Sequence, residues 1–172
     1  MGAGGIRRLP RMVWTDERIA TDRLTLRAFT TADTDVVATL LTDEVVRRYL
    51  GGPVELPNGF SAAMVADQWG SWCVGSGDTD EAIGSITLHR ERGRLELSYS
   101  LIPEAWGKGI AQEACQAIIE WVWASTEEPV LIAVTQTANE PSTRLLDRLG
   151  FAEDSRFIEH DAEQSLQFLH RG

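Results

Sequence analysis

The chain has 172 residues, of which 43% are hydrophobic and 24% are charged, proportions that are ordinary for a single globular domain. Its formal net charge is −10 and it contains no basic stripe, which argues against a nucleic-acid-binding protein. No apolar run approaches the roughly 18 residues that a membrane span requires, so we expect no membrane partner.

The N-terminal segment, residues 1–20, is rich in Gly and Arg and predicts a flexible arm in front of a domain that covers residues 21–172. Its positive charges are not followed by an apolar stretch, so we expect no secretory signal and a cytoplasmic protein. The two cysteines, Cys73 and Cys115, each lie in an apolar stretch, which favours free buried thiols in a reducing compartment. The three histidines are isolated from any second ligand at metal spacing, so we expect no metal site.

The first half of the chain predicts a strand followed by helices and then a run of strands. Apolar and polar residues alternate over residues 23–29, as in a half-buried strand, and Thr30 or Thr31 can cap the helix that follows. Residues 44–50 predict a second short helix that stops at two glycines and a proline, and residues 61–69 predict a third. An antiparallel meander with hairpin connections is expected over residues 71–74, 82–89 and 95–102.

The second half predicts two further helices and three strands. From Gly109 to about Ser125 the apolar residues recur with a period of about 3.6, which indicates a long helix. Residues 130–134 form an apolar run that suits a central strand buried on both faces. Asn139 can cap a helix that stops at Gly150, and residues 151–169 predict two strands joined near residues 161–163. This order of elements indicates a mixed α/β (α+β) domain with a mostly antiparallel sheet.

A glycine-rich loop, Trp106-Gly107-Lys108-Gly109-Ile110-Ala111, follows the strand over residues 95–102 and leads directly into the long helix. The first N–H groups of a helix lack partners and carry partial positive charge, and glycines let them approach an anion. The pattern therefore predicts a pyrophosphate cradle, with a turn that only caps the helix as the alternative. A Walker loop is excluded because Gly109 follows Lys108, and a dinucleotide fingerprint is excluded because Gln112 replaces its last glycine.

Four segments, in order and in register, resemble the GNAT N-acetyltransferase superfamily. The match is strongest to its branch of ribosomal-protein N-terminal acetyltransferases. The segments are Thr21-Asp22-Arg23-Leu24-Thr25-Leu26-Arg27, Tyr49-Leu50-Gly51-Gly52-Pro53, Glu96-Leu97-Ser98-Tyr99 with Pro103 to Ala114, and Asn139-x-x-Ser142-x-x-Leu145-Leu146-x-x-Leu149-Gly150-Phe151. The resemblance covers residues 21–160 and implies the GNAT fold, a mostly antiparallel central sheet flanked by helices and splayed at the strand that binds coenzyme A. Ser98 departs from the branch, which usually has glycine there.

The resemblance implies an enzyme that moves an acetyl group from acetyl-CoA to a primary amine by direct attack. The acceptor remains open between a small-molecule amine (an amino acid, a polyamine or an aminoglycoside) and a protein or peptide N-terminus. A monomer and a homodimer both fit, and neither a nucleic acid nor a metal is expected to take part. The alternative is a non-catalytic acyl-CoA-binding regulatory module.

The resemblance also implies which residues contact coenzyme A. They lie at the end of the motif strand, in the glycine-rich loop and at the cap of the later helix: Tyr99, Ser100, Leu101, Trp106, Gly107, Lys108, Gly109, Ile110, Ala111 and Asn139. The neighbouring strands are expected to splay after Tyr99, which would leave backbone groups free to pair with pantetheine as an added strand does. The oxyanion is expected near backbone N–H groups around Leu101.

Two residues are candidates for proton transfer. Glu96 occupies the position that the family's general base most often takes, and the alternative is a solvated strand glutamate paired with Arg94 or Arg27. Ser142 is the candidate donor to the leaving thiolate, and the alternative is a local backbone bond at the start of its helix. Many family members use a tyrosine as general acid at a later position, but no tyrosine follows Tyr99 in this chain.

Overall fold

A computed structural model describes residues 18–66 and 70–172, so that most of the predicted N-terminal arm, residues 1–17, lies outside the described residues. In this part of the chain eight strands form one sheet in the order β1-β2-β3-β4-β5-β6-β8-β7. Every neighbouring pair is antiparallel except β5 and β6, which confirms the predicted mostly antiparallel sheet. The strands are β1 (Ile19–Ala20), β2 (Leu24–Arg27), β3 (Ser71–Ser76), β4 (Ala82–Glu91), β5 (Arg94–Leu101), β6 (Val130–Gln136), β7 (Ala152–Glu159) and β8 (Ala162–His170).

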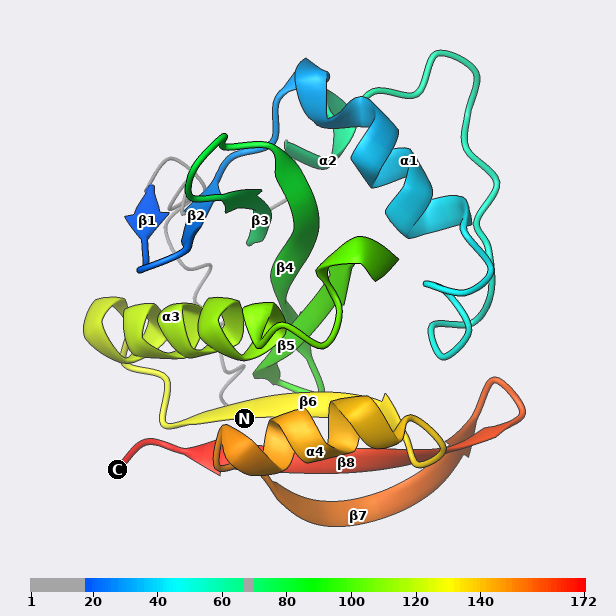
Figure 1. Ribbon diagram of the computed structural model, residues 1–172. Coiled ribbons are helices and arrows are strands. Elements are labelled where there is room, and N and C mark those ends of the chain that lie inside the picture. Colours follow the sequence, from blue (N-terminus) through cyan, green and yellow to red (C-terminus); the bar gives the residue numbers. More distant parts are fainter. Residues whose placement is uncertain (1–17, 67–69) are drawn as a thin grey trace, which may run out of the picture.

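Helices cover both faces of this sheet (Figure 1). The α-helices are α1 (Thr34–Thr42), α2 (Ala63–Ala66), α3 (Ile110–Ser125) and α4 (Glu140–Arg148), and two 3-10 turns occupy Thr31–Asp33 and Pro103–Ala105. Side chains of α3 and α4 form the larger apolar core with one face of the strands. A smaller core joins α1 and the segment before α2 to the other face, where Cys73 of β3 packs with Val37 and Ala62.

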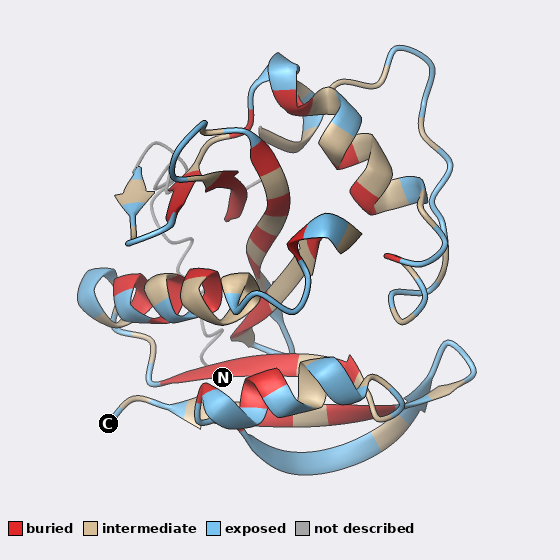
Figure 2. Ribbon diagram, in the orientation of Figure 1, coloured by how far each residue is buried: buried red, intermediate tan, exposed pale blue. Residues whose placement is uncertain are grey.

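Strand burial follows the position of each strand in the sheet (Figure 2). Along β4 buried and half-buried residues alternate, because successive side chains point to opposite faces and only one face is fully covered. In β6 the first four residues are all buried, which confirms the predicted central strand covered on both faces. Burial thus separates a closed face under α3 and α4 from a more open face, and the site uses both.

One predicted helix is absent, and another is described only in part. Residues 44–50 form consecutive turns, because side chains compete for the backbone: Asp43 Oδ1 accepts from the N–H groups of Val45 and Val46, and Arg47 Nε donates to Gly52 O. The β-branched pair Val45 and Val46 also disfavours a helix. Of the helix predicted over residues 61–69, the structure describes the turn α2, and residues 67–69 lie outside the described residues.

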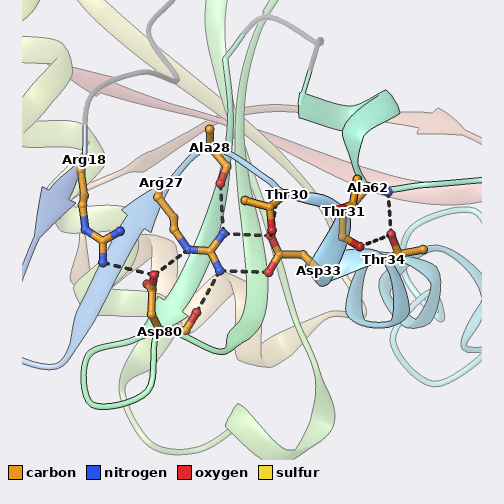
Figure 3. A network of polar contacts seen from close by, with 9 residues as sticks. All are labelled: Arg18, Arg27, Ala28, Thr30, Thr31, Asp33, Thr34, Ala62 and Asp80. Atoms are coloured by element: carbon orange, nitrogen blue, oxygen red, sulfur yellow. Dashed lines mark hydrogen bonds and ion pairs between the residues drawn. The ribbon is translucent and has the colours of Figure 1, made fainter.

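A buried polar network fixes α1 to the sheet (Figure 3). Arg27 Nη1 and Nη2 donate to the two carboxylate oxygens of Asp33 at 2.8 and 2.9 Å, and Arg27 Nη2 also donates to Asp80 O at 2.9 Å. Thr30 donates to the same carboxylate through its N–H and its hydroxyl. Burial opposes ionisation of Asp33, but the bonds from Arg27 and Thr30 outweigh it and hold the pKa of this carboxyl below its ordinary value.

Candidate active site

The strands β5 and β6 separate early in their course. Their parallel pairing consists of Leu95 with Leu131 and Glu96 with Ile132, although β5 continues to Leu101. The predicted splay after Tyr99 was therefore placed three residues too late. Each strand follows its antiparallel partner, β4 or β8, because those ladders are longer and antiparallel pairing is slightly more stable per residue.

Backbone groups of β5 face the gap that this separation creates. Ile102 N donates to Ile83 O of the neighbouring segment, so alternate residues of β5 pair with β4 and the residues between them face β6. The C=O group of Leu97 and the N–H and C=O groups of Tyr99 therefore point into the gap beyond the last pair, Glu96 with Ile132, where none of the described strands pairs with them. The next carbonyl on this side, Leu101 O, accepts a bond of 2.8 Å from Trp106 Nε1.

The glycine-rich loop lies beside this gap and leads into α3. Gly107 and Gly109 have φ of +70° and +74°, a left-handed conformation that favours glycine. The N–H groups of residues 110–112 precede the first helical bond, from Glu113 N to Gly109 O, and Gly109 offers no side chain to cap them. The space beside Gly107 is open, since a Cβ there would meet no atom within 4 Å. An anion can approach this helix start.

A clamp from the turn between β1 and β2 holds the loop in place. Glu113, in the first turn of α3, accepts hydrogen bonds from Thr21 Oγ1 at 2.6 Å and from Arg23 N and Nε at 2.9 and 2.6 Å. Arg23 Nη1 in turn donates to Lys108 O at 2.9 Å. Sequence reasoning assigned no role to this pair, although both residues lie in segments that match the family pattern.

Tyr99 and Ser142 meet across the gap. Tyr99 Oη lies 2.5 Å from Ser142 Oγ, so the serine hydroxyl contacts this phenol. The alternative interpretation of Ser142 required a bond to the local backbone instead. Asn139 Oδ1 accepts from Ser142 N at 3.3 Å, which confirms Asn139 as the cap of α4. Burial raises the pKa of Tyr99 although the bond to Ser142 lowers it, so the phenol keeps its proton.

Glu96 lies on the opposite face of β5 and is only 8% exposed. Its Oε2 is buried without a hydrogen-bond partner, and the nearest basic side chains are His89, with Nε2 3.8 Å from Oε1, and Arg92, with Nη1 3.8 Å from Oε2. Burial raises the pKa of the Glu96 carboxyl, against the opposing effect of His89 and Arg92. The alternative pairing was wrong, because Arg27 binds Asp33 and Arg94 stacks on Phe168.

Small hydroxyl groups line the sheet beside Glu96. Cross-strand partners point to the same face, and the pairs are Ser85 with Ser100, Thr87 with Ser98, and His89 with Glu96. All of these residues except Glu96 are half-buried. The side chain of Ser100, a predicted contact of coenzyme A, therefore lies on the Glu96 face and not on the Tyr99 face.

Other reactive groups are shielded or lacking in the described residues. Cys115 is a free, fully buried thiol on the apolar side of α3, and burial raises its pKa, so it stays neutral and takes a packing role. The described part of the chain contains no group of three or more His, Cys, Asp and Glu residues that could hold a metal ion. None of the helices in that part is long and apolar enough to span a membrane.

The family of the acetyltransferase (GNAT) domain matches residues 23–152, which is most of the chain. The chain belongs to the GNAT acetyltransferase family. It is 29% identical over 147 residues to the uncharacterized N-acetyltransferase YoaA of Bacillus subtilis (strain 168), a match that covers 79% of this chain and 83% of YoaA.

Solved structures show the GNAT fold that the sequence predicted. An acetyltransferase (GNAT family) from Bacillus anthracis has a TM-score of 0.79 with 22% identity, covering 90% of this chain and 98% of that one. A putative ribosomal-protein-serine acetyltransferase from Vibrio cholerae has a TM-score of 0.71 with 19% identity, covering 91% and 99%. In this GNAT domain β5 borders the strand gap beside the glycine-rich start of α3. The same strand carries Glu96 on one face and Tyr99 on the other.

Proposed function

We propose that this GNAT enzyme transfers an acetyl group from acetyl-CoA to a primary amine by direct attack. The observation that carries the proposal is the gap between β5 and β6, which has unpaired backbone on one strand, the start of α3 at its edge and Tyr99–Ser142 across it. Acetyl-CoA supplies the acetyl group as a thioester, whose carbonyl carbon a neutral amine can attack and whose leaving group is a thiolate.

The residues along the gap fit coenzyme A. The C=O of Leu97 and the backbone groups of Tyr99 would pair with the pantetheine amides in the way that an added strand pairs with a sheet edge. The N–H groups of residues 110–112, next to the two left-handed glycines, would bind the pyrophosphate. The Arg23–Glu113 clamp keeps this helix start aligned with β5.

Glu96 is the residue that takes the proton from the acceptor. An alkylamine is protonated at neutral pH and must lose a proton before it attacks, so a base beside it raises the rate. The unpartnered Oε2 of Glu96 can accept a hydrogen bond from an ammonium group, and its raised pKa makes it a stronger base than an exposed glutamate.

Ser142 is the residue that returns a proton on the other side of the strand. Tyr99 stays protonated and can donate to Ser142 Oγ, which leaves the serine proton free to point into the gap. A donor there neutralises a thiolate as it departs. A buried base and a positioned donor on the two faces of one strand favour catalysis over the alternative, a regulatory module that only binds acyl-CoA.

Thermal unfolding tests the proposal. A ligand that binds only the folded state stabilises it by about 2.7 kcal/mol at a hundredfold excess over Kd, so acetyl-CoA is expected to raise the melting temperature. ATP and NADH are expected to leave it unchanged. Stronger stabilisation by ATP than by acetyl-CoA would refute the proposal. Release of free thiol on addition of amines then separates the enzyme from the regulatory module.

A further inference from the structure

A pocket of about 250 Å³ lies beside Glu96 on the open face of the sheet. It joins the β4–β5 hairpin to β6 and to the end of β7, and its lining residues are His89, Glu91, Arg92, Glu96, Val134 and Glu159. The buried Oε2 of Glu96 has no hydrogen-bond partner, so the pocket contains an acceptor atom that the protein itself does not satisfy.

Negative charge is in excess in this pocket. Its three carboxylates face a single arginine, Arg92, whose guanidinium lies 3.9 Å from Glu91, 3.8 Å from Glu96 and 3.9 Å from Glu159. All three distances are too long for hydrogen bonds, so each carboxylate keeps the capacity to bind a donor at close range. The three carboxylates outnumber the two basic side chains of the pocket, Arg92 and His89, which leaves room, electrostatically, for additional positive charge.

Arg92 is weakly held where it lies. It occupies the β4–β5 turn with φ of +50°, next to Gly93 with φ of +76°, and its side chain is 36% exposed. Its guanidinium stacks 4.9 Å from the centre of the Phe157 ring, and within the described residues it has ion pairs but no hydrogen bond. A cationic ligand can therefore take its place beside the carboxylates at little cost.

We propose that the acceptor is a short aliphatic diamine, whose second ammonium group binds between Glu91 and Glu159 while its first amine lies at Glu96. The guanidinium of Arg92 lies within 3.9 Å of both Glu96 and Glu159, so a short diamine can span the same distance. The inference rests on the proposed function. The reacting ammonium group gives one proton to Glu96, and the nitrogen bonds to the acetyl carbon as the carbon–sulfur bond breaks. The departing thiolate takes a proton from Ser142, and the second proton that the nitrogen loses on becoming an amide restores the serine hydroxyl.

Size and charge separate a diamine from the other acceptors. The pocket lies at or below the lower end of the range for small-molecule sites, about 300–1,000 Å³, which disfavours a multi-ring aminoglycoside. A peptide N-terminus or an amino acid without a basic side chain carries only one ammonium group and leaves Glu91 and Glu159 without a new partner. Amino acids also bring a carboxylate into a pocket that is already negative.

A panel of acceptors at equal concentration tests the inference by thiol release from acetyl-CoA. The panel contains 1,4-diaminobutane, butylamine, alanine and an alanine-initiated tripeptide. We expect kcat/KM for the diamine to exceed that for butylamine by at least about tenfold, the worth of one charge-assisted hydrogen bond. Equal values, or a preference for the peptide, overturn the inference and leave the proposed function standing. Binding of acetyl-CoA without turnover of any amine overturns both.

Variants identify the second ammonium site. We expect Glu159→Gln to lower the ratio of kcat/KM for the diamine to kcat/KM for butylamine about tenfold. Glu163→Gln is the matched control, because Glu163 lies on the same hairpin but pairs with Arg156, away from the pocket. Arg92→Asn, which tolerates the left-handed turn, removes the competing cation and is expected to lower KM for the diamine. A wild-type response in Glu159→Gln, or a higher KM in Arg92→Asn, contradicts the assignment.

Discussion

Tyr99 Oη and Ser142 Oγ lie 2.5 Å apart across the gap between β5 and β6, and this contact joins the motif strand to the N-terminus of α4. The buried phenol keeps its proton, because burial raises its pKa. Either hydroxyl can donate in this contact, and when the tyrosine is the donor the serine hydroxyl is free to donate elsewhere. We infer that Tyr99 acts through Ser142 as a positioning residue.

Removal of this contact is expected to slow turnover only when the serine is present. Tyr99→Phe should lower kcat roughly tenfold, the worth of one hydrogen bond at the upper end of the usual range. Ser142→Ala should lower kcat by about 10²-fold or more, as loss of a general acid does. In the double variant, Tyr99→Phe should cause no further fall in kcat beyond that of Ser142→Ala, which steady-state kinetics can measure.

Tyr49→Phe is the matched control for this cycle, because Tyr49 lies in the turns after α1 and stacks with Arg48 instead. It is expected to keep the wild-type kcat. Additive losses in the double variant would show that Tyr99 supports the fold or the cofactor independently of Ser142.

A branched side chain in the cradle is expected to weaken binding of coenzyme A. Gly109→Val places a β-branched residue at φ of +74°, at the start of α3 where the pyrophosphate would approach. The strain of the left-handed backbone costs about 1–2 kcal/mol of stability, so the matched control is Gly51→Val, at φ of +82° and far from the cradle in sequence. Both variants should unfold earlier, but only Gly109→Val should lose affinity for acetyl-CoA in calorimetry. Equal affinities in the two folded variants would remove the loop from the binding site.

Patterns within a single element were enough to predict much of this fold. The period of about 3.6 after Gly109 located α3, and the alternation over residues 23–29 located β2, because each pattern is a local property of one element. The turn residues at Asn139 and Gly150 marked the ends of α4 for the same local reason. The glycine-rich loop could be located by its position between a strand and a helix.

Relations between distant segments could not be predicted in this way. Arg23 and Glu113 are 90 residues apart in sequence, and their contact depends on the position of β2 beside α3. The partners of Glu96 were predicted wrongly because a strand pattern gives the face of a residue but not the long side chains that reach that face. Arg92 reaches it from a turn, where its left-handed backbone directs it toward β7.

Neutralisation of Asp33 is expected to destabilise the fold at neutral pH. Asp33→Asn breaks a buried, doubly bonded pair with Arg27, a change that typically costs about 3–5 kcal/mol. The folded pKa of Asp33 is lowered, so its contribution is present above the unfolded pKa of about 3.9 and is lost as pH falls through the lower folded value. Urea unfolding of wild type and variant should therefore differ most near neutral pH and converge in acid. Asp35→Asn, on the exposed side of α1, should match wild type throughout, and a pH-independent deficit in Asp33→Asn would mean that packing dominates.

Loss of the Glu96 carboxylate is expected to lower turnover while leaving the affinity for acetyl-CoA unchanged. General base catalysis contributes about 10²–10⁴-fold, which bounds the fall in kcat for Glu96→Gln with any accepted amine. The defect should shrink as pH rises toward the pKa of the amine, because free amine then forms without help. Stopped-flow thiol release across this range measures both effects, and a defect that does not change with pH would assign Glu96 to substrate orientation.

The same substitution also reports the ionisation of Glu96 through stability. His89, Arg92, Glu91 and Glu159 surround this carboxyl, and burial dominates, so its folded pKa lies above the unfolded value. The contribution of this carboxyl to the free energy of unfolding is therefore fully present below its unfolded pKa and is lost as pH rises through its folded pKa. Glu96→Gln has no such proton to lose, so its free energy of unfolding should exceed that of wild type increasingly above that pH. Parallel pH profiles for the two proteins would show that the buried carboxyl ionises normally, and would remove the basis for treating it as a tuned base.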